Sequence, residues 1–293
     1  MFEGTYTALI TPFRQGALDS EALRRLVERQ IEGGIHGLVV LGTTGEASAL
    51  THAERISAVR HVVEQTRGRV PVVVGTGTHS TQATVEATRE MTQHKIDGVL
   101  VVTPFYVKPT QAGLLNHFGQ VAEVGLKVVV YNVPSRTGVT LTAETAAKLA
   151  AIPNVVALKE ASGDMKLGSQ ILEAAGARLK ILSGDDFTYL PLLALGGHGC
   201  ISVVSNVCPR AMVDLFEHWM KGEVAKAQEI HHRLFPLMEA LFTESNPIPV
   251  KAAMALIGAC DPEIRAPLTV LSEKFRPQLA EQLDRLGLSG GPR

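Results

Sequence analysis

The chain alternates between short apolar runs rich in β-branched residues and longer stretches in which apolar positions recur at helical spacing. Each apolar run ends in a polar or Gly-rich turn, so the repeating unit is a strand, a turn and a helix. The pattern predicts strands near 7–10, 37–41, 70–74, 98–102, 127–131, 155–158, 179–182 and 200–203. Helices are predicted in the intervals, for example at 20–32, 52–66 and 142–151.

This repeat predicts an α/β fold of the (β/α)8 TIM barrel class rather than an open, doubly wound sheet. A barrel of this kind accommodates most of the 293 residues as one domain. After the eighth strand the pattern stays helical, interrupted at Asn246-Pro247-Ile248-Pro249, because proline rings cannot continue a helix. We therefore predict a barrel over residues 1–225 and a C-terminal helical extension over residues 226–293.

The composition argues against nucleic-acid binding, membrane association and export. With 28 Lys and Arg against 29 Asp and Glu, the formal net charge is -1, so no nucleic-acid partner is expected. The apolar runs are strand-sized, and no basic segment followed by an apolar one opens the chain. We therefore expect neither a membrane partner nor export. The three cysteines fit neither a disulfide framework nor a metal motif, which suits a cytoplasmic protein.

Lys159 is the leading candidate for chemistry. In such barrels, catalytic groups follow the strands, and Lys159 comes directly after the apolar strand in VVALKEASGD, whereas Lys127 and Lys180 precede strands. Partial desolvation at this position favours the neutral amine, which attacks ketones. We predict a Schiff-base lysine. The alternative is a structural lysine that reaches solvent or pairs with Glu160 or Asp164.

Other strand ends carry groups that suit a keto acid. In LGTTGEAS, Thr43 and Thr44 offer hydroxyls and backbone amides near a helix start, where a carboxylate can bind. Tyr131 ends the fifth strand and can transfer protons, and Arg136 follows it and can hold a second carboxylate. The structural alternatives are a capped turn, a core tyrosine and a surface arginine.

Metal and cofactor signals are weak, so we expect neither. Of the histidines only His52 and His79 follow strands, short of the three ligands of a catalytic metal site. The segment GTGTHS at Gly75 lacks the third glycine of a dinucleotide loop. Asp185 and Asp186, in the SGDD loop after the seventh strand, would repel a phosphate, so an unphosphorylated substrate is expected.

The motifs GTTGE, TPFY, YNVPSRTG, LKEASGD, LSGDD, GGHGCISV and NPIPVK, in this order, closely resemble the dihydrodipicolinate synthase family. The resemblance implies a lyase that joins pyruvate, held as an imine on Lys159, to L-aspartate 4-semialdehyde. Its product would be 4-hydroxy-tetrahydrodipicolinate, in the diaminopimelate route to L-lysine. Tyr131 would be the general acid/base, linked through Thr43 to Tyr106 in a hydroxyl relay. In the family this last tyrosine comes from the neighbouring subunit, and a homotetramer of two tight dimers is expected.

The resemblance also implies substrate contacts. Thr44 and the backbone at Ile201 would hold pyruvate, and Gly184 would also belong to the substrate-binding residues. Arg136 would hold the carboxylate of the semialdehyde. Related pyruvate lyases that act on N-acetylneuraminate or a 2-keto-3-deoxy sugar acid share the barrel, the lysine and the first tyrosine. Arg136 and Tyr106 favour the synthase. A catalytically inactive relative that binds a keto acid is the other alternative, and the intact relay and lysine speak against it.

Some members of the family that this chain resembles bind lysine as an inhibitor, and the chain differs from them at several positions of that site. His52 is kept there, but the other positions read Arg55, His79, Ala83 and Phe105. A carboxylate and a phenol are lost and a cation is gained, which disfavours an ammonium ligand. We predict weak or absent feedback inhibition by lysine.

Overall fold

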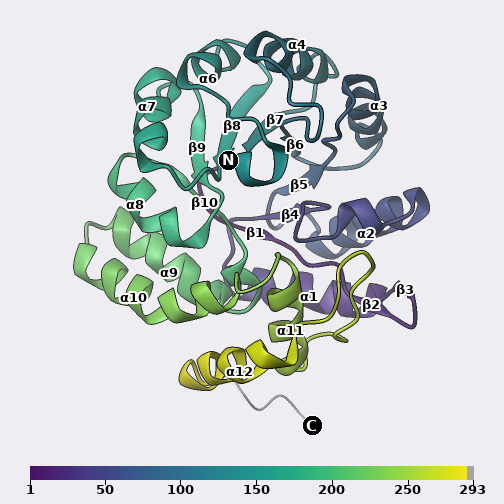
Figure 1. Cartoon of the computed structure of the whole chain (residues 1–293), viewed down its shortest axis with the longest axis vertical. Coiled ribbons are helices and arrows are strands. Elements are labelled where there is room, and N and C mark those ends of the chain that lie inside the picture. The colour runs from purple at the N-terminus through teal and green to yellow at the C-terminus, as the bar shows by residue number, and fades with distance from the viewer. Residues whose placement is uncertain (289–293) are drawn as a thin grey trace. The chain divides into compact units, whose positions relative to one another are not determined.

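The computed structural model of the chain describes residues 1–288 and contains a closed barrel of eight strands (Figure 1). Around the barrel the strands follow the order β1, β10, β9, β8, β7, β6, β5, β4. Their bounds are β1 (Gly4–Ala8), β4 (Gly37–Val40), β5 (Val72–Gly75), β6 (Gly98–Val102), β7 (Val128–Asn132), β8 (Val155–Glu160), β9 (Lys180–Ser183) and β10 (Gly199–Ser202). The predicted fold class is confirmed. A separate hairpin of β2 (Phe13–Arg14) and β3 (Ala17–Leu18) was not predicted.

Helices follow the strands as the pattern predicts. They are α1 (Ser20–Glu32), α2 (His52–Thr66), α3 (Thr81–Met91), α4 (Gln111–Ala122), α5 (Pro134–Thr137), α6 (Ala143–Leu149), α7 (Met165–Ala175), α8 (Tyr189–Ala194), α9 (Pro209–Met220), α10 (Val224–Ala240), α11 (Ile248–Leu256) and α12 (Arg276–Arg285). Four short 3₁₀ helices are η1 (Ala47–Ala49), η2 (Asp186–Thr188), η3 (Val204–Asn206) and η4 (Glu273–Phe275). Within residues 1–288, no helix is both long and apolar enough to cross a membrane.

Side-chain caps fix the helix starts that the sequence predicts best. The Asp19 carboxylate accepts from the Ala22 amide at the start of α1, and Thr51 forms a capping box with Glu54 at the start of α2. Both helices match their predicted ranges. Thr142 caps α6, which ends at Leu149, two residues before the predicted end at 151.

The chain divides into two compact units, which are described one at a time. Unit 1 consists of Met1–Tyr6 and Pro71–Ile201, and unit 2 of Thr7–Val70 and the chain from Ser202 onward. The predicted division between residues 225 and 226 stays a prediction, and residues 289–293 of the predicted extension lie outside the described residues.

Unit 1 is built on neighbouring parallel strands from β5 to β10, whose outer face is covered by α3, α4, α6, α7 and α8 (Figure 1). The strands are apolar on both faces and therefore read as continuous hydrophobic runs. In the register of β7 and β8, Tyr131 pairs with Lys159. Residues paired across adjacent strands present their side chains on the same face, so this register brings the two together.

Unit 2 joins β4, α1 and α2 to the four C-terminal helices, with α9 packed on α10 and α12 packed on α10 and α11. Buried amides secure the strand end at residues 8–10: the Asn206 side chain accepts from the Ile10 amide (3.1 Å) and donates to the Ala8 carbonyl (2.8 Å). The interruption of the helical pattern is confirmed, but it covers residues 241–247, and Ile248 and Pro249 form the first turn of α11 instead of breaking the helix.

Candidate active site

Lys159 lies inside β8, as its second-last residue, and not directly after the strand as predicted. Its side chain is buried, with 6% of the residue exposed, and Nζ lies 4.2 Å from the centroid of the Tyr131 ring. Within residues 1–288, no carboxylate lies within ion-pair distance of this Nζ. The structural alternative, a lysine paired with Glu160 or Asp164, is therefore absent, and the amine stands against an aromatic face.

Glu160, the next residue, has partners of its own. The Asn132 side-chain amide donates to Oε2 (2.8 Å) and the Ser162 backbone amide donates to Oε1 (2.6 Å). Burial raises the pKa of Glu160 above its ordinary value in spite of these bonds. Successive strand residues point to opposite faces, so Glu160 faces away from Lys159 and fixes the strand end.

Gly184, directly after β9, leaves room for the catalytic candidate. A Cβ atom at this position would lie 3.0 Å from Lys159 Cε and 2.5 Å from Ala161 Cβ. Both distances are at or below the limit of ordinary packing, so a larger residue would displace the lysine chain. The predicted site residue Gly184 thus borders Lys159.

Asp185 is a site residue that sequence reasoning interpreted only as a barrier to phosphate. Burial raises the pKa of Asp185, while the positive charges of Lys159 and Arg136 act to lower it. Its carboxyl group therefore lies within electrostatic reach of both cations. Arg136 itself is exposed on α5, just after β7, and Ile201 is buried in β10.

Tyr131 and Tyr106 lie in contrasting surroundings within unit 1. Tyr131 is buried in β7, whereas Tyr106 is 90% exposed in the loop after β6. Tyr106 also has a left-handed backbone with φ 71°, which costs energy in a non-glycine residue. Across the described residues, no hydrogen bond joins the two tyrosines. The predicted relay between them stays a prediction.

Thr43 and Thr44 belong to a tight loop in unit 2. Thr44 is buried, and its Oγ1 accepts a hydrogen bond from the Asn246 side-chain amide (2.9 Å). The loop is flanked by two left-handed residues, Leu41 with φ 57° and Glu46 with φ 51°. The three-residue η1 follows the loop, and α2 begins at residue 52, where its start was predicted. The loop contains backbone amides and threonine hydroxyls, which are the groups that can donate hydrogen bonds to a carboxylate.

Comparison with known proteins decides the family. The sequence model of the dihydrodipicolinate synthetase family matches residues 1–286. The chain belongs to this family.

Individual relatives agree with the dihydrodipicolinate synthetase family assignment. The chain is 47% identical to the 4-hydroxy-tetrahydrodipicolinate synthase of Magnetococcus marinus and 48% identical to that of Nitratidesulfovibrio vulgaris, in each case over 98% of this chain and 99% of the relative. The solved dihydrodipicolinate synthase of Thermotoga maritima matches with a TM-score of 0.97 at 45% identity, covering 98% of this chain and 99% of that chain. The resemblance inferred from the motifs is confirmed.

A further solved structure bears on assembly in the dihydrodipicolinate synthetase family. It is described as the first monomeric dihydrodipicolinate synthase variant, and it matches with a TM-score of 0.97 at 45% identity over 98% of this chain and 97% of that chain. At least one structure of this similarity is therefore that of a monomeric variant.

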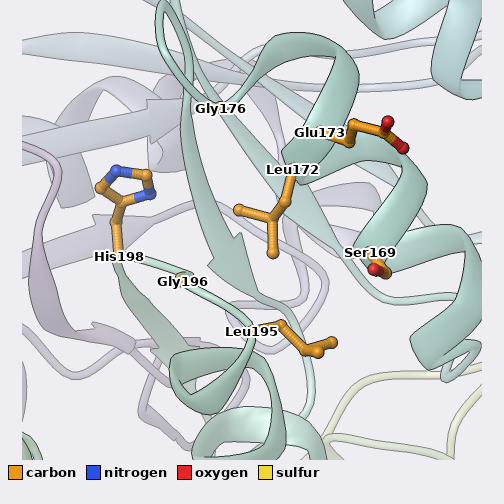
Figure 2. A pocket seen from close by; sticks show the side chains of 7 residues that line it. All are labelled: Ser169, Leu172, Glu173, Gly176, Leu195, Gly196 and His198. Atoms are coloured by element: carbon orange, nitrogen blue, oxygen red, sulfur yellow. The ribbon is translucent and has the colours of Figure 1, made fainter.

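None of the predicted site residues of this family member lines either of two surface hollows in unit 1. One, of about 380 Å³, lies where α7 approaches the turn before β10 (Figure 2). Its lining is Ser169, Leu172, Glu173, Gly176, Leu195, Gly196 and His198. In the part of the chain that the structure describes, no group of three His, Cys, Asp or Glu side chains is arranged to hold a metal ion.

Proposed function

We propose that this chain is a 4-hydroxy-tetrahydrodipicolinate synthase, a lyase that condenses pyruvate with L-aspartate 4-semialdehyde in the diaminopimelate route to L-lysine. Its identity to relatives of that name supports the synthase over a lyase of N-acetylneuraminate or a 2-keto-3-deoxy sugar acid. The observation that carries the proposal is the buried Lys159 amine, which faces the Tyr131 ring at 4.2 Å without a carboxylate partner in residues 1–288.

Lys159 starts the reaction as the nucleophile. Its neutral amine attacks the carbonyl carbon of pyruvate, a C–N bond forms, and the carbonyl oxygen leaves as water after protonation. Loss of a proton from the pyruvate methyl group gives an enamine, whose carbon attacks the aldehyde of the second substrate. The amino group of that substrate then displaces Lys159 from the imine carbon, which closes the ring and frees the enzyme.

Protons for these steps pass through a relay of hydroxyls. Tyr131 acts as general acid and base beside Lys159, and Thr43 links it to Tyr106. The 90% exposure and left-handed backbone of Tyr106 support a role outside its own subunit. Within one chain, the energy cost of this strained backbone is not offset by burial of the side chain. Each active site then receives Tyr106 from the partner in a tight dimer.

Substrate carboxylates are held by the remaining predicted residues. Thr44 and the backbone at Ile201 hold pyruvate beside Gly184, which keeps space for the imine. Arg136, exposed on the short helix α5 that follows β7, holds the carboxylate of the semialdehyde bidentately. Asp185 lies near this arginine and the lysine and sets the local charge of the site.

The proposed assembly is a homotetramer of two tight dimers in the cytoplasm. Its support within the chain is the exposed loop Phe105, Tyr106 and Val107, three large apolar or aromatic residues in a row. Consecutive exposed residues of this kind are typical of an interface. Sedimentation of the purified protein measures the assembly directly.

A substrate panel tests the function. Purified protein is incubated with pyruvate and L-aspartate 4-semialdehyde, and separately with N-acetylneuraminate or a 2-keto-3-deoxy sugar acid, and products are measured by mass spectrometry. We expect condensation product only from the first pair. Cleavage of a sugar acid without condensation would replace the synthase by its closest rival, and no turnover of any substrate would favour an inactive binding protein.

A further inference from the structure

A buried ion pair in unit 2 includes the last residue of the loop 42–46, which carries Thr43 and Thr44 and is called the threonine loop. Lys251 Nζ is 2.6 Å from Glu46 Oε1, and each side chain is only 1% exposed. Burial lowers the pKa of Lys251, and the charge of Glu46 acts against that shift. Desolvating two charges is costly, and a well-packed apolar pair is often as stable. Stability alone is therefore a weak reason for this pair.

The pair fixes the end of the threonine loop. Glu46 is the last residue of the loop and has a left-handed backbone, and its Oε2 accepts from the Arg265 backbone amide (3.0 Å). Lys251 in turn donates to the Glu263 carbonyl (2.7 Å) and lies 4.0 Å from the centroid of the Phe13 ring. The Glu46 carboxylate is thus held by α11 and by the segment that follows it.

A hydrogen bond also connects the segment just before α11 to Thr44. Asn246, two residues before α11, donates its side-chain amide to Thr44 Oγ1 (2.9 Å). A hydroxyl that accepts one bond still has its own hydrogen to donate. This arrangement directs the Thr44 hydroxyl hydrogen toward another acceptor, and a substrate carboxylate is the acceptor that the proposed function supplies.

We propose that Lys251 and Glu46 are positioning residues, which hold the loop so that Thr44 binds the carboxylate of pyruvate. This inference rests on the proposed function and gives the C-terminal helices a part in it. Neither residue touches the reacting atoms. Their effect is therefore expected in pyruvate binding and not in the later chemical step.

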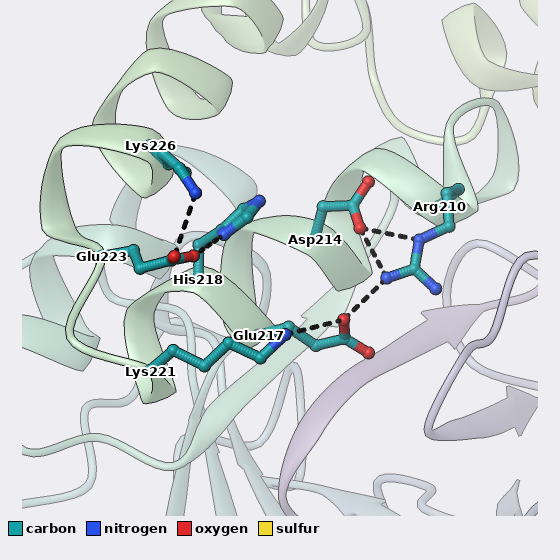
Figure 3. Close-up of polar contacts among 7 residues, drawn as sticks. All are labelled: Arg210, Asp214, Glu217, His218, Lys221, Glu223 and Lys226. Carbon is teal, nitrogen blue, oxygen red and sulfur yellow. Dashed lines mark hydrogen bonds and ion pairs between the residues drawn. The ribbon is translucent and has the colours of Figure 1, made fainter.

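The experiment compares Glu46→Gln/Lys251→Met and the shape-conserving Glu46→Gln with wild type. The matched control is Lys226→Met, which removes an exposed lysine 2.9 Å from Glu223 on the surface of α10 (Figure 3). Circular dichroism and melting establish folding, and kinetics are measured well below the melting temperature. We expect the KM for pyruvate to rise at least about tenfold, because small displacements of binding groups are costly. The KM for the semialdehyde and kcat should change little.

A Thr44→Val background separates positioning from a general structural role. If Lys251 and Glu46 act through Thr44, their replacement should change the pyruvate KM far less in Thr44→Val than in wild type. A folded double variant, or a folded Glu46→Gln if the double variant does not fold, with wild-type KM for pyruvate would overturn the inference. Equal effects in both backgrounds would do the same. Wild-type protein that does not condense pyruvate at all would instead overturn the proposed function, and this inference with it.

Discussion

Two buried lysines of this chain have opposite surroundings. Lys251 in unit 2 has a carboxylate at 2.6 Å and a carbonyl at 2.7 Å, whereas Lys159 in unit 1 faces an aromatic ring at 4.2 Å. The carboxylate of Glu46 favours the charged form of Lys251 and acts against the burial that lowers the pKa of this lysine. No described carboxylate does this for Lys159 at ion-pair distance. Burial alone does not make a lysine a nucleophile, but burial against an aromatic ring without a carboxylate at ion-pair distance suits one.

Removal of Lys159 should give the largest effect on activity. Lys159→Met is expected to lower kcat/KM at least about 10³-fold, because a covalent nucleophile is not replaced by its neighbours. Steady-state kinetics measure the loss. Lys127→Met is the control, since Lys127 is an exposed lysine directly before β7. Activity of Lys159→Met close to that of wild type would contradict the comparison.

Removal of Lys251 should give the largest effect on stability. Lys251→Met leaves the Glu46 carboxylate buried without its cation, and we expect a loss of about 3–5 kcal/mol in the free energy of unfolding. Glu46→Gln/Lys251→Met should recover most of this loss, because no uncompensated charge remains. Guanidinium unfolding measures both. Lys159→Met should lose little, so equal losses at the two lysines would erase the difference between them.

His117 extends the comparison to a buried base that is only partly hydrogen-bonded. Its Nδ1 lies 2.9 Å from Thr81 Oγ1, and Nε2 has no hydrogen-bond partner within the described chain. Burial lowers the pKa of His117 to about 4. The unfolded chain therefore takes up this proton first as the pH falls below about 6.5, so the folded state loses stability between there and pH 4.

The size of this pH effect is measurable as a difference. Between pH 7 and pH 4, wild type should lose about 3 kcal/mol of unfolding free energy relative to His117→Gln, which carries no titrating ring. Denaturant unfolding of both proteins at several pH values cancels the contribution of the carboxylates. A difference that does not vary with pH would mean that His117 is not buried as a neutral base.

An exposed lysine and glutamate pair should give the smallest effect. Lys226 is exposed and lies 2.9 Å from Glu223, within the charged cluster on α9 and α10 shown in Figure 3. Solvent and salt screen such a pair. Lys226→Met is expected to leave the urea midpoint unchanged at low and high salt. A shift comparable with that of Lys251→Met would show that burial does not separate the two pairs.

The barrel was predictable because its strands are buried on both faces and read as continuous β-branched runs. The starts of α1 and α2 were predictable from Asp19 and Thr51, whose side chains cap them. The first strand begins at Gly4, earlier than predicted, because polar threonines interrupt its pattern there. The two-residue strands β2 and β3 were missed because they are too short to show a period.

The candidate site was predictable where it follows strands and not where it depends on distant segments. Lys159 and Tyr131 were found from their places at strand ends, and the register of β7 and β8 brings them together. Asn246 and Thr44 are 202 positions apart, so their hydrogen bond has no local signal. The Lys251 and Glu46 pair was missed for the same reason.

Trapping the imine tests the central proposal most directly. Protein is treated with borohydride in the presence of pyruvate, digested and mapped by mass spectrometry, with a sample lacking pyruvate as the control. We expect one reduced pyruvate on the peptide that contains Lys159 and none on the peptide that contains Lys251, although both lysines are buried. No adduct at saturating pyruvate, or an adduct only at another lysine, would contradict the assignment of Lys159 as the Schiff-base residue.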